Sequence, residues 1–262
     1  MSKPTVTRVL IVDDSAYVRK VVAQMLSRSP FLEVVGTARD GQEALDQVIA
    51  LKPDVITCDL IMPNLDGVGF VRQQMARRPL PILIVSVASE SGEMVLNALD
   101  AGAVDFIQKP TALASERLLD MTQDLIEKVR GAASARLQPA HPAALVSTPS
   151  RSAFRGRGAV DIVVLGISTG GPQALRSLIP QLPSDLPVPM AIVLHMPVGY
   201  TELYARKLDE ISPLSVCEAA DGLELRAGNV LIAPAGRHLS FRRNDKGMVV
   251  THLDVRPLDT PH

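Results

Sequence analysis

Short hydrophobic runs alternate with amphipathic stretches through the first half of the chain. Five runs are rich in β-branched residues and end in polar ones, at 8–14, 32–38, 54–60, 81–88 and 104–110. Helical patterns occur between or after them, at 16–28, 41–52, 67–78 and 115–130. Strands that alternate with amphipathic helices indicate βαβ units and a parallel sheet. The pattern predicts one compact domain of five such units.

A second α/β pattern begins near residue 161. Buried-strand runs at 161–166 and 189–196 are each followed by a helical stretch, at 171–182 and 199–212. Short strands and turns are then expected at 214–219, 228–236, 237–243 and 248–255, with no closing helix after them. We expect an incomplete doubly wound parallel α/β domain that is truncated at its C-terminal end.

The stretch between the two patterns has no hydrophobic period. Residues 131–158 consist mainly of Ala, Pro, Ser and Arg, with four basic and no acidic residues. This composition is typical of a linker. The predicted organisation is a first domain at 1–130, a linker at 131–158 and a second domain at 159–262.

Composition narrows the class of protein. Hydrophobic residues make up 47% of the chain and aromatic residues 3%, with no Trp, which suits parallel sheets covered by helices. A net charge of −1 gives no electrostatic reason to expect nucleic acid. No segment has the roughly 18 apolar residues of a membrane helix, and the first apolar run is too short for a signal peptide. We expect a cytoplasmic protein with reduced cysteines that neither binds nucleic acid nor inserts in a membrane.

Charged and polar residues gather at the predicted strand ends of the first domain. Asp13 and Asp14 end the first strand, Asp59 the third, Ser86 the fourth and Lys109 the fifth. Ligands of doubly wound sheets bind outside the carboxyl ends of the strands. Carboxylates there suit Mg²⁺ and phosphate chemistry, in which one carboxylate is the nucleophile and a Lys neutralises phosphoryl oxygens. The alternative is that each Asp caps the helix after its strand.

The segments "LIVDDS", "CDLIMPNLDG", "IVSVAS" and "DFIQKP" resemble the receiver domain of two-component response regulators. The resemblance implies a flavodoxin-like (βα)5 fold with Asp59 as phosphoacceptor. It also implies Mg²⁺ bound by Asp14, Asp59 and the main-chain carbonyl of Ile61, with Asp13 assisting through water. Ser86 and Lys109 would sense the phosphoryl group, and Phe106 would fill the aromatic switch position. A histidine kinase would be the phosphodonor.

In the second domain, "GISTG" at 166–170 follows an apolar strand and precedes a helix. It fits the G-x-S-x-G pattern around a nucleophilic serine. It lacks the Gly-Lys-Ser/Thr of a phosphate loop and the G-x-G-x-x-G of a dinucleotide site. Ser168 is therefore either a nucleophile or a helix N-cap. His195 ends the next strand run, where it is a candidate general base.

The segments "GISTGGPQAL", "VLHMPVGYTELYARKLD" and "EAADGLELRAGNVLIAPAGRHLSF" resemble the catalytic domain of chemotaxis protein-glutamate methylesterases. The resemblance implies Ser168 as nucleophile, His195 as base and Thr169 as oxyanion donor. The implied activity is hydrolysis of glutamyl methyl esters on chemoreceptors, with deamidation of certain glutamines as a second activity. In that family, a receiver that covers the esterase cleft would release it on phosphorylation.

The catalytic acid is expected to be missing. In the family it lies in a Gly-Met-Gly-x-Asp-Gly segment, which this chain does not contain, and Asp221, Asp254 and Asp259 do not fit that pattern. Neutralising the acid of a Ser-His-Asp triad costs about 10⁴ in turnover. The alternative function is therefore a non-catalytic receiver that acts as a phosphate sink or docks on receptors. A DNA-binding response regulator is disfavoured, because the second domain shows no helix-turn-helix pattern.

Overall fold

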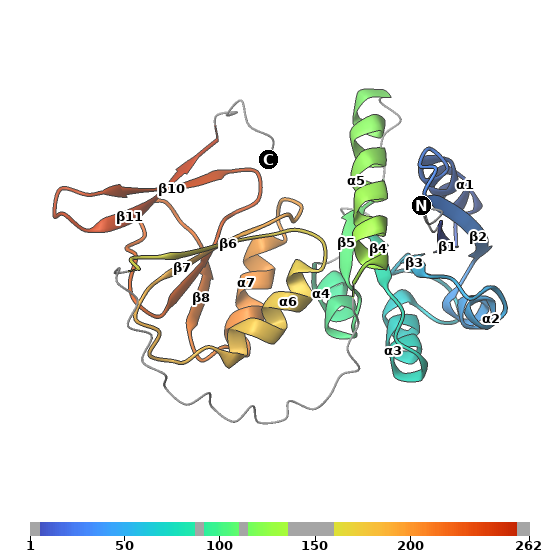
Figure 1. Cartoon of the computed structure of the whole chain (residues 1–262), viewed down its shortest axis with the longest axis horizontal. Coiled ribbons are helices and arrows are strands. Elements are labelled where there is room, and N and C mark those ends of the chain that lie inside the picture. The colour runs from blue at the N-terminus through green and yellow to red at the C-terminus, as the bar shows by residue number, and fades with distance from the viewer. Residues whose placement is uncertain (1–5, 87–91, 110–114, 136–159, 256–262) are drawn as a thin grey trace, which may run out of the picture. The chain divides into compact units, whose positions relative to one another are not determined.

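A computed structural model describes residues 6–86, 92–109, 115–135 and 160–255 of the chain. Contacts divide it into two compact units, each with its own parallel sheet (Figure 1). Most of the predicted linker, together with Asp259, lies outside the described residues. Within the part that is described, no helix is both long and apolar enough to cross a membrane.

The first unit has a five-stranded parallel sheet with the order β2-β1-β3-β4-β5. Its strands are β1 (Thr7–Val12), β2 (Leu32–Ala38), β3 (Val55–Cys58), β4 (Ile82–Ser86) and β5 (Asp105–Gln108). Its helices are α1 (Ala16–Leu26), α2 (Gly41–Leu51), α3 (Gly67–Arg77), α4 (Gly92–Asp100) and α5 (Ser115–Ala133). The predicted five βα units are confirmed, and α4 is the helix that the hydrophobic pattern did not single out.

Helix starts in this unit follow from local side chains. Ser15, Asp40 and Asp66 are the N-caps of α1, α2 and α3, and each accepts a hydrogen bond from a backbone N–H of the first turn. Such caps satisfy donors that have no partner within the helix. Asp13 and Asp59 are thus not helix caps, so the capping interpretation of these two acids is wrong.

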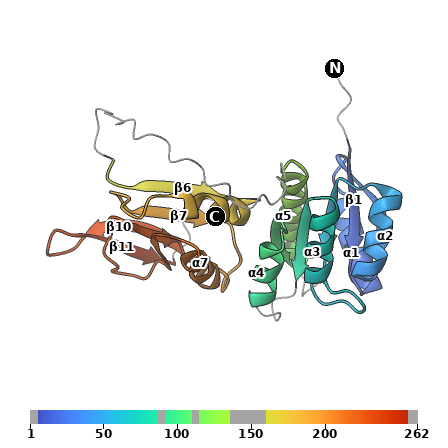
Figure 2. The ribbon, with the colours of Figure 1, turned by 90° about the horizontal axis from the view of Figure 1, so that it is seen from below.

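Helices cover both faces of the five-stranded sheet. Helices α1 and α5 contact each other on one face, and α3 contacts both α2 and α4 on the other (Figures 1 and 2). The core under α1 and α5 is formed by aliphatic side chains such as Val9, Ile11, Leu83 and Val129. Because both faces are buried, the strands are hydrophobic throughout and do not alternate with polar residues.

The second unit has a four-stranded parallel sheet with the order β6-β7-β9-β8. Its strands are β6 (Val163–Ile167), β7 (Met190–Leu194), β8 (Ser215–Glu218) and β9 (Asn229–Ile232). The helical elements along this part of the chain are α6 (Gly171–Leu178), the short 3₁₀ helix Ile179–Gln181 and α7 (Thr201–Glu210), which packs on β8 and β9. The contact division assigns Ser168–Ser177 to the first unit. Strands β10 (His238–Arg243) and β11 (Val249–Asp254) pair as a separate antiparallel hairpin. The parallel α/β prediction is confirmed for this sheet.

Candidate functional site

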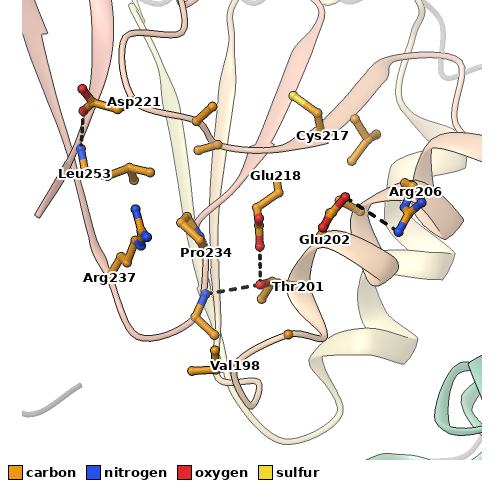
Figure 3. A pocket seen from close by; sticks show the side chains of 16 residues that line it. Val198, Thr201, Glu202, Arg206, Cys217, Glu218, Asp221, Pro234, Arg237 and Leu253 are labelled. Carbon is orange, nitrogen blue, oxygen red and sulfur yellow. Dashed lines mark hydrogen bonds and ion pairs between the residues drawn. The ribbon is translucent and has the colours of Figure 1, made fainter. Parts of the chain in front are cut away.

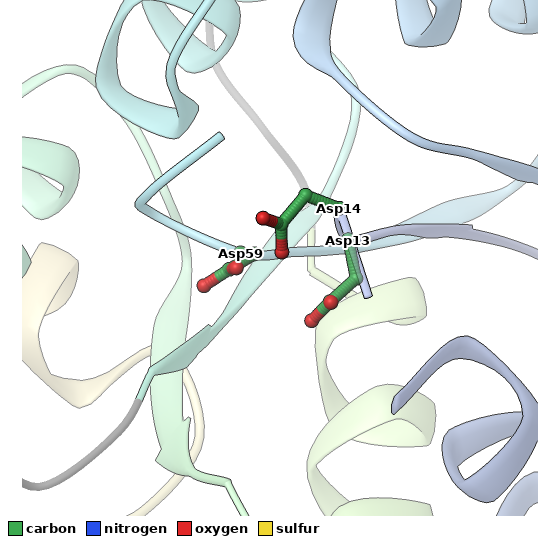
Figure 4. A group of neighbouring side chains, drawn as sticks. All are labelled: Asp13, Asp14 and Asp59. Atoms are coloured by element: carbon green, nitrogen blue, oxygen red, sulfur yellow. The ribbon is translucent and has the colours of Figure 1, made fainter. Parts of the chain in front are cut away.

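Two paired strands bring the acidic residues of the first unit together. Val12 of β1 is in register with Cys58 of β3, and the backbone N–H of Asp59 donates to the carbonyl of Val12 at 2.9 Å. Asp13 and Asp59 therefore lie directly after the ends of two neighbouring strands, and Asp14 is the residue after Asp13. The three carboxylates each offer an oxygen within 4.8 Å of the others (Figure 4). Asp13 and Asp59 are buried, whereas Asp14 is exposed.

Lys109 completes this cluster from the end of β5. Its Nζ lies 2.7 Å from Asp59 Oδ2 and 2.9 Å from Asp13 Oδ2. Its backbone N–H donates to the carbonyl of Ser86 at 2.6 Å, which joins the ends of β4 and β5. Burial lowers the pKa of Lys109, but the hydrogen bonds and charges of Asp59 and Asp13 outweigh it and leave the pKa above 10.5. The lysine is therefore a permanent cation between two acids.

The residues of the cluster fit a hard divalent cation. Carboxylate oxygens on one side of a site suit Mg²⁺, which keeps several waters and takes phosphate oxygens as further ligands. Asp14 presents its carboxylate at the exposed side, while one Asp59 oxygen, Oδ1, accepts the N–H of Leu60 at 2.7 Å. Ile61 follows in the same loop, with a side chain that is 55% exposed.

The loop after Asp59 needs glycine at position 67. A side-chain Cβ at Gly67 would lie 2.1 Å from the carbonyl oxygen of Asp59, which no other residue tolerates. The Gly67 N–H donates to the carbonyl of Leu60 at 2.9 Å, and α3 starts at this glycine. This contact explains why the "NLDG" part of the motif ends in glycine.

Two further predicted residues are buried at the ends of the sheet. Ser86 is the last residue of β4 and is 1% exposed, and Phe106 in β5 is equally buried. The Phe106 N–H donates to Asp105 Oδ1 at 2.7 Å, and the other oxygen of Asp105 lies 3.0 Å from Lys128 Nζ on α5. Burial raises the pKa of Asp105, and the charge of Lys128 opposes that shift. The backbone at Phe106 is thus linked to α5.

Sequence reasoning missed Arg19. Its guanidinium donates to the carbonyl oxygens of Asp13 at 2.7 Å and Asp14 at 3.0 Å. The Ser15 N–H also donates to Asp13 Oδ1, at 2.9 Å. Arg19 therefore holds the turn that carries the acid pair. The available signal was a basic residue one helical turn beyond the N-cap of α1, where its side chain points back to the helix start.

In the second unit, β6 and β7 bring the candidate catalytic residues to adjacent strand ends. Ile167 is in register with Leu194, and the His195 N–H donates to the carbonyl of Ile167 at 3.1 Å. Ser168 is therefore the residue after the end of β6, and His195 is the residue after the end of β7, its paired neighbour. His195 is exposed.

The turn after Ser168 differs from a strained nucleophile elbow. The Gly171 N–H donates to the carbonyl of Ser168 at 2.8 Å, and Gly170 has φ of +79°. That pattern is a type II turn, which needs glycine at its third position. Ser168 does not have a positive φ. Thr169 lies inside this turn, ahead of α6, so its N–H is not part of the helix itself.

The acids near the second site lie apart from His195. Asp221 Oδ1 is 3.0 Å from His252 Nδ1 and also accepts the Leu253 N–H at 2.8 Å. Asp254 is the last residue of β11. Within the described part of the chain, no carboxylate forms an ion pair or hydrogen bond with the His195 ring.

Two protein families match this chain. The response regulator receiver domain matches residues 9–123, and the CheB methylesterase matches residues 163–260. A Myxococcus xanthus protein named protein-glutamate methylesterase/protein-glutamine glutaminase 5 is 49% identical over 257 residues, which cover 97% of this chain and 73% of the relative. A Symbiobacterium thermophilum protein of the same name, without the number, is 45% identical over 246 residues, covering 88% and 68%. The receiver domain of Thermotoga maritima CheB is 42% identical and covers 50% of this chain and 99% of that one, with a TM-score of 0.46.

The fold and the matches define a protein that joins a response regulator receiver domain to a CheB methylesterase domain with a parallel sheet. The chain belongs to the family of protein-glutamate methylesterases/protein-glutamine glutaminases. Both resemblances predicted from the sequence are thereby confirmed.

Proposed function

We propose that the chain hydrolyses glutamyl methyl esters on chemoreceptors in the cytoplasm under the control of phosphorylation, and that it also deamidates certain receptor glutamines. The observation that carries this proposal is the pairing of Ile167 with Leu194. Because of this pairing, Ser168 and His195 lie directly after the ends of two neighbouring strands. Family membership supplies the reaction class. The proposed domains are a receiver at 1–130, a linker at 131–158 and a catalytic domain at 159–262.

In the receiver, Asp59 is the proposed phosphoacceptor, with a chemotaxis histidine kinase as phosphodonor. An Asp59 oxygen would attack the phosphorus of the kinase's phosphohistidine, so that the P–N bond breaks, the histidine leaves and an acyl phosphate forms on Asp59. Asp14, Asp59 and the Ile61 carbonyl would hold Mg²⁺, with Asp13 assisting through water. When bound, Mg²⁺ would neutralise phosphoryl oxygens. The cluster supports this role, because its carboxylates are close together and fit the ion.

Lys109 is the proposed sensor of the phosphoryl group, together with Ser86. In the unphosphorylated chain the Lys109 ammonium is bound to both Asp59 and Asp13. A phosphoryl group on Asp59 adds negative charge beside this cation, so the lysine must redistribute its contacts. Phe106 is the proposed aromatic switch, and it is buried in β5, three residues before Lys109.

In the catalytic domain, Ser168 Oγ would attack the ester carbonyl while His195 takes the hydroxyl proton. The negative charge on the carbonyl oxygen would be stabilised by the Thr169 N–H. Methanol would leave with the proton from His195. Water would then cleave the acyl-serine by the same route in reverse, which regenerates Ser168 and leaves a free glutamate.

A second candidate function is a non-catalytic receiver that acts as a phosphate sink or docks on receptors. One observation favours it: no carboxylate is bonded to the His195 ring among the described residues. A serine-histidine pair without its acid is slowed by about 10⁴. The two functions differ in the chemistry of Ser168. An esterase, even a slow one, has a reactive serine at this position, whereas a non-catalytic receiver does not.

A serine-directed fluorophosphonate tests the proposal without requiring turnover. We expect mass spectrometry of the full chain to find the label on Ser168, and we expect His195→Ala to slow that labelling. The matched control is His238→Ala, which removes a histidine from β10. Labelling of Ser168 at the same rate in all three chains would contradict the role of His195. No labelling of Ser168 would favour the non-catalytic function.

A further inference from the structure

A cavity of about 640 Å³ lies at the carboxyl ends of three parallel strands in the second unit (Figure 3). Its lining comes from the segments between Val198 and Arg206, Val216 and Asp221, and Pro234 and Arg237, together with Leu253 of β11. Ligands of open α/β sheets bind at this edge. The volume is in the range of small-ligand pockets.

A hydrogen-bonded group fixes the floor of this pocket. Thr201 is 1% exposed, and its Oγ1 donates to Glu218 Oε1 at 2.5 Å. The same oxygen accepts the Ala235 N–H at 3.3 Å. Figure 3 shows the bond between Thr201 and Glu218 as a dashed line. One buried hydroxyl therefore joins the start of α7, the end of β8 and the segment after β9.

The acids of the pocket already have partners. Glu202 Oε1 lies 3.7 Å from Arg206, and Glu218 accepts the Thr201 hydroxyl. Asp221 accepts the Leu253 N–H and is shared with His252 and Arg242. Among the described residues that line the pocket, Arg237 is the charged side chain for which no ion pair or side-chain hydrogen bond is found. The group available for a ligand is thus a guanidinium, whose planar fork matches a carboxylate.

Apolar side chains form much of the remaining wall. They are Val198, Ala205, Val216, Ala219, Pro234 and Leu253. Such a wall suits a short aliphatic stem, and Arg237 suits a negatively charged end. A glutamate side chain combines these two properties.

We propose that this pocket binds a free glutamate side chain of the substrate segment, near the esterified residue, with Arg237 as the residue that selects it. The inference rests on the proposed function. Val198 is three residues after His195, so the pocket begins within about 11 Å of the candidate base. Gly236, the residue before Arg237, lies against Val198, since a Cβ at Gly236 would be 3.1 Å from Val198 Cγ2. In this proposal, a glutamate close to the ester in the same segment reaches Arg237 while the ester lies at His195. The enzyme therefore prefers esters flanked by unmodified glutamates.

Binding of two synthetic peptides to the full chain tests this proposal. Both carry one glutamyl methyl ester, flanked by glutamates in the first and by glutamines in the second. Fluorescence anisotropy of labelled peptides gives the two affinities. We expect the glutamate peptide to bind about five- to tenfold more tightly, because a charge-assisted contact is formed in a partly desolvated site.

Three variants separate the pocket from general electrostatic attraction. Arg237→Gln should remove the difference between the peptides, and Arg237→Lys should keep part of it. Arg226→Gln is the matched control, because Arg226 is paired with Glu224 at 2.7 Å and does not line the pocket. This control should keep the full difference.

The outcomes distinguish the pocket from the esterase chemistry. Equal affinity of the two peptides, no binding of either, or an unchanged preference in Arg237→Gln would overturn the proposal. Ester hydrolysis is measured separately on the same samples. Preference for the glutamate peptide without hydrolysis would support the proposed role of the pocket and contradict the proposed reaction. Hydrolysis without preference would support the reaction and contradict the role of the pocket.

Discussion

The ammonium of Lys109 lies 2.7 Å from Asp59 and 2.9 Å from Asp13, so one buried cation holds two carboxylates from neighbouring strands. One ammonium neutralises these two carboxylates only in part, and either a metal ion or a phosphoryl group changes the charge around them. We therefore propose that the receiver senses phosphorylation through a redistribution of charge around this lysine.

Removing that cation should destabilise the first unit. We expect Lys109→Met to lower the free energy of unfolding by about 3 kcal/mol, because Asp13 and Asp59 are then buried close together without a counter-charge. Millimolar Mg²⁺ should restore more stability to this variant than to the parent chain. Urea unfolding followed by circular dichroism, with and without Mg²⁺, measures both effects. An unchanged midpoint in both buffers would contradict the role of Lys109.

Arg19 should matter for metal affinity. Arg19→Ala frees the carbonyls of Asp13 and Asp14, so we expect Mg²⁺ to bind several-fold more weakly, with less loss in Arg19→Lys. Isothermal titration calorimetry measures this affinity, and Lys20→Ala, an exposed neighbour on α1, is the control. Equal Mg²⁺ affinity in Arg19→Ala and Lys20→Ala would show that the two hydrogen bonds do not position the acids.

Asp40 should stabilise α2 in a pH-dependent way. It accepts the Glu43 N–H at 2.8 Å and the Asn64 side-chain amide at 2.7 Å, and these bonds lower its pKa below 3.8. Asp40→Ala should cost about 1–2 kcal/mol at pH 7.

Because the folded-state pKa of Asp40 is the lower one, its charge contributes stability above pH 3.8, and this part is lost as the pH falls through the folded value. The difference between the parent chain and Asp40→Ala should therefore shrink below about pH 4. Unfolding midpoints of both chains across this range measure it. A difference that is constant with pH would mean that the charge of Asp40 contributes nothing.

Thr57 should be replaceable without loss. Its Oγ1 is buried in β3 with no hydrogen-bond partner among the described residues. Thr57→Val keeps the shape and removes the hydroxyl, so we expect a gain of about 1 kcal/mol. Thr57→Ala is the control, which should destabilise through lost packing. A clear loss of stability in Thr57→Val would indicate that the hydroxyl has a partner in solution, such as a bound water.

The acidic cluster of the receiver could be predicted from the sequence, because its residues lie where the strands end. Asp13 and Asp59 directly follow hydrophobic runs, Lys109 follows another after Gln108, and parallel strands bring such positions together. The same argument placed Ser168 and His195. Short-range patterns identify these residues, since the covalent chain fixes where each strand stops.

Other features depend on contacts that no local pattern reveals. Gly67 is needed because of the Asp59 carbonyl, eight residues earlier in the chain. The pocket around Arg237 requires Thr201, Glu218 and Ala235, which come from three different segments. The motif around Asp221 predicts that it is not the catalytic acid, but its bond to His252 follows from the approach of β11 to the turn after β8. These are tertiary contacts, for which hydrophobic periodicity carries no signal.

The central claim is that phosphorylation at Asp59 controls hydrolysis at Ser168. The most direct test is methanol release from methylated chemoreceptor by the full chain, with Mg²⁺ and a small phosphodonor, alongside Ser168→Ala and Asp59→Asn. We predict slow release that rises with the phosphodonor, stops in Ser168→Ala and no longer responds to the phosphodonor in Asp59→Asn. Release that persists in Ser168→Ala, or no release from a chain whose Asp59 is phosphorylated, would contradict the account.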